Sequence, residues 1–282
     1  MQCLVSVPGD TARRLHQLVE PIHLVTYISD EPTDALLALG LRNYWDGYFA
    51  GRAAPLGRVP AGVVHAIFYN FAGGEVARHI PRVWDTVTPE AALAAREQGS
   101  VAALRRILGD LADAPSLARA ADLATRAATS APTEGRTLYA ALRTLPLPEE
   151  PVARLWHAAT LLREHRGDGH IAALVAAGIG GTESHVLHAL SQNMPAEKFG
   201  RVHHLAAARL AKVVDGMRAR GLVGASGWLS DTGRNTKERI ESLTDDLAAP
   251  AYASLAPSEL DQLIADLGPI SARLDAAGSR SA

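Results

Sequence analysis

The stretch AAARLAKVVDGMRARGLVGASGWLSDTGR, residues 206–234, carries the clearest pattern in the chain. Apolar residues recur at the spacing of one helix face from Leu210 to Met217, and Gly221 follows a basic last turn, which is typical of a helix end. Two apolar pairs, Leu222-Val223 and Trp228-Leu229, then flank a Gly-Ala-Ser-Gly turn. The stretch therefore predicts a helix, a short β-hairpin wing and the start of another helix.

Upstream of this stretch, the patterns are those of a helical protein. Thr88-Pro89-Glu90 has the cap, proline and acid order of a helix start, whereas residues 22–28 fit either a short strand or an extended segment. Residues 152–163 and 170–177 predict two helices, and Gly167-Asp168-Gly169 predicts a tight turn between them.

A chain of 282 residues has room for about two domains. The segment 144–151 carries Pro146, Pro148 and Pro151, a composition that breaks helices and suits an exposed connection. We therefore predict a mainly α fold, with a helical domain over residues 1–150 and a winged-helix domain over residues 151–282.

Composition narrows the functional classes. Hydrophobic residues make up 48% of the chain and charged residues 21%, which is ordinary for a folded protein. The net charge of −2 provides no global cationic field, so a nucleic-acid contact requires a local basic patch. Cys3 is the single cysteine, which excludes an internal disulfide and a thiolate zinc cluster. The sequence has neither an export signal nor an apolar run of membrane-spanning length, so we expect a cytoplasmic protein without membrane contact.

Three runs, MRARGLV, GWLSDTGR and IESLTDDL, resemble the helix, wing and following helix of the MarR-type winged-helix proteins. Leu229 to Arg234 is similar to their Leu-Thr-x-x-Gly-Arg segment, and the resemblance covers about Trp156 to Ala277. It implies a dimer, because the helix that corresponds to Pro257–Ala277 usually helps to form the dimer in such proteins. The stretch LWHAATLLREHRGDGHIAALVAAGI also resembles an actinobacterial family of helix-turn-helix proteins with a helical N-terminal half.

The MarR-type resemblance identifies the helix before the wing as the recognition helix. Its candidates for DNA binding are Arg201, His204, Arg209 and Lys212, since cations early on such a helix contact phosphates or guanine edges. Arg234 is the candidate to replace the wing arginine of these regulators, because the short turn contains none. The alternative is that these cations form an ordinary solvated face.

Aromatic side chains with polar tips lie beside arginines in the N-terminal half. Tyr44, Tyr48, Arg52 and Tyr69 carry this pattern, which fits a pocket for a flat or anionic small molecule. Core packing of the rings is the alternative.

The segment 163–170 is unusually polar for a connection between two apolar helices. It contains Arg166 and His170, which we predict to bind a small molecule together with the aromatic group, in a site between the two halves. The alternative is structural: Asp168 caps the following helix, while Arg163 and Glu164 form an ion pair on the surface.

Histidines are dense between His157 and His204, and His185 and His188 share a helix face. No recognised metal-ligand motif accompanies them, so we expect structural or surface histidines and no metal site. The sequence contains no nucleophile elbow, phosphate-binding glycine loop or dinucleotide fingerprint. It therefore names neither a catalytic residue nor a cofactor, and it leaves enzyme activity open.

Two functions remain. The first is a ligand-responsive transcriptional regulator that binds DNA as a dimer through its C-terminal half and senses a small molecule with its N-terminal half. The second is a winged-helix derivative that has lost DNA binding and binds or transforms a small molecule between the halves. Exposed cations on the helix that ends at Arg220 favour the first function, and their burial against the N-terminal half favours the second.

Overall fold

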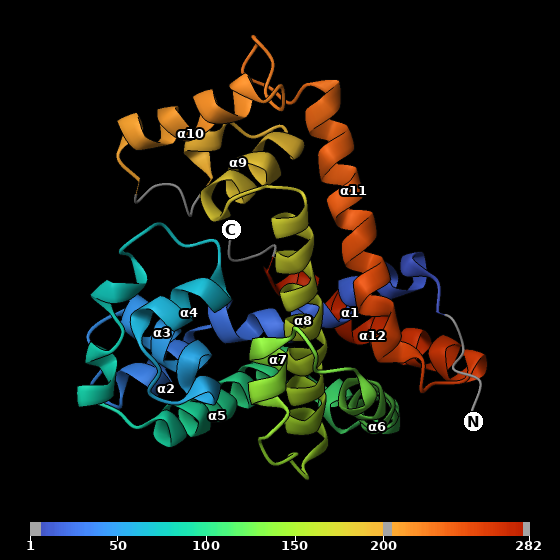
Figure 1. Ribbon diagram of the computed structural model, residues 1–282. Helices are drawn as coiled ribbons and strands as arrows, with labels where there is room; N and C mark the ends of the chain where they lie inside the picture. Colours follow the sequence, from blue (N-terminus) through green and yellow to red (C-terminus); the bar gives the residue numbers. More distant parts are fainter. Residues whose placement is uncertain (1–6, 200–204, 279–282) are drawn as a thin grey trace.

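The computed structural model describes residues 7–199 and 205–278, and it confirms the mainly α fold. The α-helices labelled in Figure 1 are α1 Gly9–Ile28, α2 Asp30–Leu37, α3 Tyr44–Ala53, α4 Ala61–Phe68, α5 Pro89–Leu108, α6 Pro115–Ser130, α7 Thr137–Leu142, α8 Pro151–Ala176, α9 Gly181–Ser191, α10 Ala207–Ala219, α11 Asp231–Ala248 and α12 Pro257–Gly278. Short 3₁₀ helices occupy Ala54–Leu56, Val76–Arg78, Arg82–Asp85, Gly109–Asp113, Ala196–Lys198 and Ala249–Tyr252. Within the described ranges, no helix is both long enough and apolar enough to span a membrane.

The buried apolar side chains form two separate cores. The larger core draws on α1 to α7, the first half of α8 and α12, and the smaller core draws on residues 173–240. We call residues 7–162 and 248–278 the body, and residues 173–240 the head. Figure 1 shows α8 and α11 running side by side from the body into the head. The predicted boundary at residue 150 coincides with the start of α8, but the change of core occurs in the middle of that helix.

The helix α8 is continuous over 26 residues, which corresponds to about 39 Å. The predicted turn at Gly167-Asp168-Gly169 is therefore wrong, and contacts from α7 explain why. A Cβ on Gly169 would lie 2.0 Å from Nη1 of Arg136, which donates to the His165 carbonyl at 2.8 Å. Asp168 accepts the backbone N–H of Tyr139 at 3.0 Å, so it caps α7 rather than a helix of its own.

The predicted hairpin wing is reduced to one antiparallel bridge between Val223 and Leu229, and residues 7–199 and 205–278 contain no β-strand. Ser230 follows as the cap of α11, accepting the N–H of Gly233 at 3.0 Å. A Cβ on Gly233 would lie 2.1 Å from the carbonyl oxygen of Leu222, so only glycine fits there. The start of α11 is thereby fixed directly against the turn.

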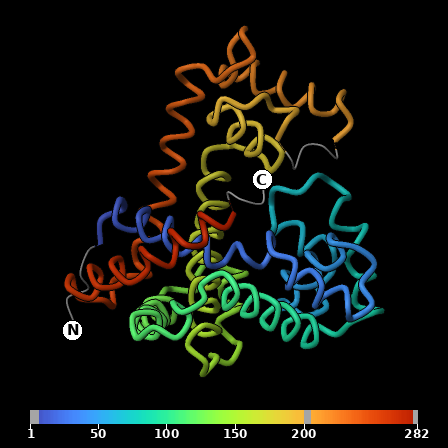
Figure 2. Tube along the Cα trace, turned by 180° about the vertical axis from the view of Figure 1, so that it is seen from behind, coloured from blue at the N-terminus to red at the C-terminus, as the bar shows by residue number. Residues whose placement is uncertain are grey.

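The apolar stripe of α12 is buried within its own chain. Leu260, Leu263, Leu267, Ile270 and Leu274 are each at most 8% exposed. The helix packs on α1, α5 and α6, and Figure 2 shows it lying along α1 at the back of the body. The apolar face of the helix to which the MarR-type resemblance assigned the dimer therefore packs within a single chain.

Candidate functional site

The helix α10 presents most of its surface to solvent. Leu210 and Met217 are its buried side chains, whereas Arg209 and Lys212 are exposed. In the part of the chain that the structure describes, neither of these two cations has a carboxylate within ion-pair distance. They are therefore accessible to an anionic partner.

The cations at the end of α10 already have partners within the head. Arg218 pairs with Asp215 at 2.6 Å, and Arg220 pairs with Glu183 at 2.5 Å. These two arginines contribute less to an anion-binding surface than Arg209 and Lys212, because an incoming phosphate would compete with a carboxylate.

The other predicted DNA contacts fall into two groups. Arg234 donates to the carbonyl of Leu229 at 2.7 Å and pairs with Asp231 at 2.5 Å, so it holds the turn before α11 in place. Its side chain is nevertheless 60% exposed. Arg201 and His204 lie outside the described residues.

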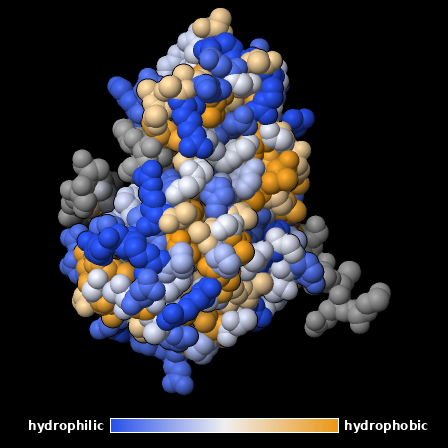
Figure 3. Space-filling model, turned by 60° about the vertical axis from the view of Figure 1, so that its left-hand side comes forward, coloured by the Kyte–Doolittle hydropathy of each residue, from blue (hydrophilic) through white to orange (hydrophobic). Residues whose placement is uncertain are grey.

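The head concentrates positive charge in an otherwise acidic chain. Residues 173–240 contain nine lysines and arginines and five aspartates and glutamates, a net charge of +4. The whole chain carries −2, so the remainder carries −6. Figure 3 shows hydrophilic side chains over much of the head. The overall composition does not reveal this local excess of positive charge.

A loop of the body, residues 69–73, contacts the head at three points; we call it the bridging loop. The hydroxyl of Tyr69 donates to the carbonyl of Ile179 at 2.5 Å, and Nε2 of His185 donates to the carbonyl of Asn70 at 2.8 Å. A Cβ on Gly73 would lie 3.2 Å from Nη2 of Arg209. The loop therefore touches the segment before α9, α9 itself and α10.

The bridging loop begins in a strained conformation. Tyr69 has φ 58° and ψ −55°, and the N–H of Asn70 donates to the carbonyl of Phe68 at 2.6 Å, which is the pattern of a rare γ-turn. A Cβ on Gly181, the first residue of α9, would lie 2.1 Å from the carbonyl oxygen of Tyr69. The turn and α9 are thus in direct backbone contact, and such strain persists only where the surroundings enforce it.

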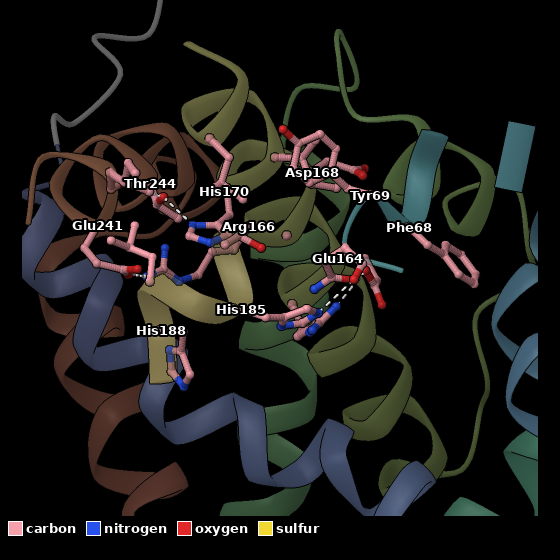
Figure 4. A pocket seen from close by; sticks show the side chains of 18 of the residues that line it. Phe68, Tyr69, Glu164, Arg166, Asp168, His170, His185, His188, Glu241 and Thr244 are labelled. Carbon is pink, nitrogen blue, oxygen red and sulfur yellow. Dashed lines mark hydrogen bonds and ion pairs between the residues drawn. The ribbon is translucent and has the colours of Figure 1, made fainter. Parts of the chain in front are cut away.

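A cavity of about 480 Å³ lies between the body and the head. Its wall draws on α1, α3 and α4, on the bridging loop, and on α8, α9 and α11. Figure 4 shows imidazole, carboxylate and aromatic side chains from these elements gathered around it. The polar middle of α8, which the sequence analysis assigned to a turn, forms one side of this cavity.

Four of the six predicted ligand residues line this cavity: Arg52, Tyr69, Arg166 and His170. Their role in ligand binding stays a prediction. Tyr44 and Tyr48 lie outside the wall, because one helical turn places Tyr48 behind Arg52, which donates to its hydroxyl at 2.9 Å. The rings of both tyrosines pack against neighbouring aromatic rings, as the core-packing alternative states.

Glu164 is the buried centre of the polar wall. It accepts from Arg163 at 2.9 Å and from Arg52 at 3.3 Å, and its side chain is 2% exposed. Burial opposes its ionisation, but the two guanidinium groups outweigh burial and hold the pKa of Glu164 well below its usual range. The Arg163–Glu164 pair expected on the surface therefore exists, but its carboxylate is buried and its guanidinium group is only partly exposed.

Arg166 and His170 connect α8 to α11 beside the cavity. Arg166 pairs with Asp245 at 2.9 Å, and Nδ1 of His170 lies 2.9 Å from the hydroxyl of Thr244. That hydroxyl donates to the carbonyl of Ile240, so Nδ1 carries the proton of the imidazole and Nε2 is left as an acceptor. Burial lowers the pKa of His170 to about 4, so the ring is neutral at physiological pH.

Sequence reasoning missed the contribution of α11. Lys237, Glu241 and Thr244 line the cavity, and Lys237 and Glu241 form an ion pair. Their i, i+4 and i, i+3 spacing marks one helix face but gives no indication of what that face covers. Within the described ranges, no group of three or more His, Cys, Asp or Glu side chains is placed to hold a metal ion.

Comparison with known proteins bears on the body and the head together. Residues 12–280 match the model of a family described as a helix-turn-helix family. A search of curated proteins and a search of solved structures found no match. Since the match extends over nearly all of the chain, the protein belongs to this helix-turn-helix family.

Proposed function

We propose that the protein is a winged-helix transcriptional regulator that binds DNA through α10 and responds to a small molecule in the cavity. The observation that carries this proposal is the pair Arg209 and Lys212, exposed on a head with a net charge of +4 and, among the described residues, without carboxylate partners. Cations that form no ion pair within the protein are available to neutralise phosphates.

The geometry of the head supports α10 as the recognition helix. It follows α9 in the chain and buries only Leu210 and Met217 among its described side chains, so the rest of its surface can enter a major groove. The turn between Val223 and Leu229 then acts as a minimal wing. This arrangement agrees with the resemblance to the MarR-type proteins.

The bridging loop supports regulation by a ligand. Tyr69 and Asn70 line the cavity, and the same loop contacts α9 and reaches Arg209 on α10. A ligand that displaces this loop changes the contacts that hold the recognition helix in place. It shifts the equilibrium between two positions of the head to the extent that it binds one position more tightly than the other.

The dimer belongs to the same proposal, because two recognition helices on one duplex require two copies of the head. The stripe on α12 is buried in its own chain, so a dimer uses another surface. Light scattering at tens of micromolar tests it, and a monomer both with and without duplex DNA rejects it.

Salt-dependent DNA binding is the decisive experiment. We expect the wild-type protein to bind duplex DNA at low ionic strength, and the double change Arg209→Ala and Lys212→Ala to weaken binding to every sequence. Each lost phosphate contact reduces the slope of log K against log salt by about 0.9, so the double variant should lose about 1.8.

Arg58→Ala with Arg273→Ala is the matched control, because both arginines are exposed and lie in the body. This pair should leave the slope unchanged. A wild-type protein that binds no DNA at low salt rejects the regulator, and the cavity then supports the alternative of a winged-helix derivative that binds or transforms a small molecule. An equal loss in both double variants would show that the effect is only one of net charge.

A further inference from the structure

The charges in the cavity wall cancel. The wall contains four cationic side chains, Arg52, Arg163, Arg166 and Lys237, and four carboxylates, Glu20, Glu164, Asp168 and Glu241. Each of the four cations also has a carboxylate within 3.5 Å, and Arg52 and Arg163 share Glu164.

The carboxylates are likewise engaged. Glu164 forms ion pairs with Arg52 and Arg163, and Glu241 pairs with Lys237. Glu20 lies 3.2 Å from Nε2 of His16, and Asp168 accepts the N–H of Tyr139. An anionic ligand would have to compete with the carboxylate that each cation already contacts, and breaking a buried ion pair is costly. A cationic ligand would have to compete with the cations on Glu164 and Glu241 or with the hydrogen bonds of Glu20 and Asp168.

The remainder of the wall suits an uncharged ring. Ile171, Leu187, Phe199 and Ile240 supply apolar surface, and the volume of about 480 Å³ lies in the range that encloses small organic ligands. His170 adds one hydrogen-bond acceptor, because Nδ1 donates to the hydroxyl of Thr244 and Nε2 carries no proton. That acceptor matches an O–H or N–H donor on the ligand.

We infer that the cavity binds an uncharged organic molecule with a ring-sized apolar surface and a hydrogen-bond donor that meets Nε2 of His170. This inference rests on the proposed small-molecule response and specifies its ligand class. Of the flat or anionic ligand that the sequence predicted, it keeps the flat ring and not the anionic charge, because each arginine of the wall already contacts a carboxylate. Burial also lowers the pKa of His188, so this imidazole adds no positive charge to the wall.

Three matched probes test the inference: indole-3-ethanol, which is neutral, indole-3-acetate, which is an anion, and tryptamine, which is a cation. Binding to the full chain is measured near neutral pH by saturation-transfer NMR and calorimetry, without DNA. We expect indole-3-ethanol to bind at least about tenfold more tightly than either charged probe.

Two variants locate the site. Leu174→Trp fills the cavity and should abolish binding, whereas Val175→Trp, at a neighbouring position that is 60% exposed, should leave it unchanged. His170→Phe keeps a flat ring but removes the acceptor, so it should weaken indole-3-ethanol by about tenfold and leave the charged probes unaffected.

Preference for indole-3-acetate or tryptamine would overturn the inference, and so would the absence of binding by all three probes at millimolar concentration. Binding that persists in Leu174→Trp would place the site elsewhere and would also overturn it. Since no DNA is present, these outcomes are independent of the salt-dependence test of DNA binding.

Discussion

Gly181→Ala tests the contact between the bridging loop and the head. The new Cβ would lie 2.1 Å from the carbonyl oxygen and 3.0 Å from the carbonyl carbon of Tyr69. An ordinary contact requires about 3.4 Å, so backbone must move by roughly 1 Å on one side or the other, a displacement typical of overpacked sites. The γ-turn at Tyr69 is already strained and should yield first.

The expected cost follows from the contacts at this point. Overpacking of a tight site costs about 1–3 kcal/mol. Separation of the loop from α9 also weakens the hydrogen bonds from Tyr69 to Ile179 and from His185 to Asn70, each worth about 0.5–1.5 kcal/mol. We expect the free energy of unfolding to fall by about 2–4 kcal/mol in urea denaturation, with faster amide exchange in the bridging loop and α9.

Gly62→Ala is the control for this change. Gly62 lies in the first turn of α4, and a Cβ there meets nothing within 4 Å, so alanine should be neutral or stabilising by about 0.5–1 kcal/mol. If Gly181→Ala is as stable as Gly62→Ala and amide exchange in the loop and α9 is unchanged, the bridging loop does not support the head and the proposed coupling has no structural basis.

Three further predictions concern the middle of α8. Burial raises the pKa of Asp168 to about 6, so its ionisation destabilises the fold as pH rises from about 4 to 6. Asp168→Asn keeps an acceptor for the N–H of Tyr139 and should be more stable than the wild type near pH 7, by up to about 3 kcal/mol. Urea titrations should show that this difference disappears near pH 4. Burial lowers the pKa of His157, His165 and His170 to about 4 each, so the neutral rings stabilise the fold fully above about pH 6.5 and this contribution is lost on acidification toward pH 4. Circular dichroism should show unfolding in this pH window. A signal that does not change with pH would contradict the buried neutral state of these rings. Arg136→Met removes the bonds to the carbonyls of His165 and Leu247 and should cost about 2–3 kcal/mol in chemical denaturation; a loss below about 0.5 kcal/mol would mean that Gly169 is held in the helix without this arginine.

Local signals in the sequence predict local structure well. Thr88 caps α5 by accepting the N–H of Ala91 at 3.2 Å, with Pro89 in the first turn as expected. Gly221 ends the region of α10 at φ 72°, a backbone conformation that favours glycine. In each case the residues that begin or end the helix lie within a few positions of it, so a short window of the sequence contains the whole signal.

Elements that depend on distant partners were predicted less well. Residues 22–28, expected as a strand or an extended segment, form the end of α1, which continues through Pro21 and is buried along the body core. Gly167 and Gly169 lie inside α8 because Arg136 and Asp168 compensate the local preference for a turn. No window of the sequence contains both partners of these contacts.

The candidate site divides in the same way. Arg52 and His170, which the sequence analysis assigned to one ligand site, line the same cavity, whereas Tyr44 and Tyr48 do not. The cancellation of charge was not predictable, since the partners of Arg52 and Arg166 are Glu164 and Asp245, on other helices. The inferred class of ligand depends on these pairs, which the sequence alone does not show.

The same polar segment explains why the cavity lies at the joint between the two cores. The large core ends at Leu162 and the small core begins at Ala173, so residues 163–172 of α8 belong to neither. Their side chains form ion pairs and hydrogen bonds, among them Arg52 with Glu164 and Arg166 with Asp245, rather than close apolar packing. We propose that a change in the angle between head and body occurs at this segment, because it belongs to neither core. We propose that a ligand in the cavity, which lies at this joint, acts on α9 and α10 through the bridging loop.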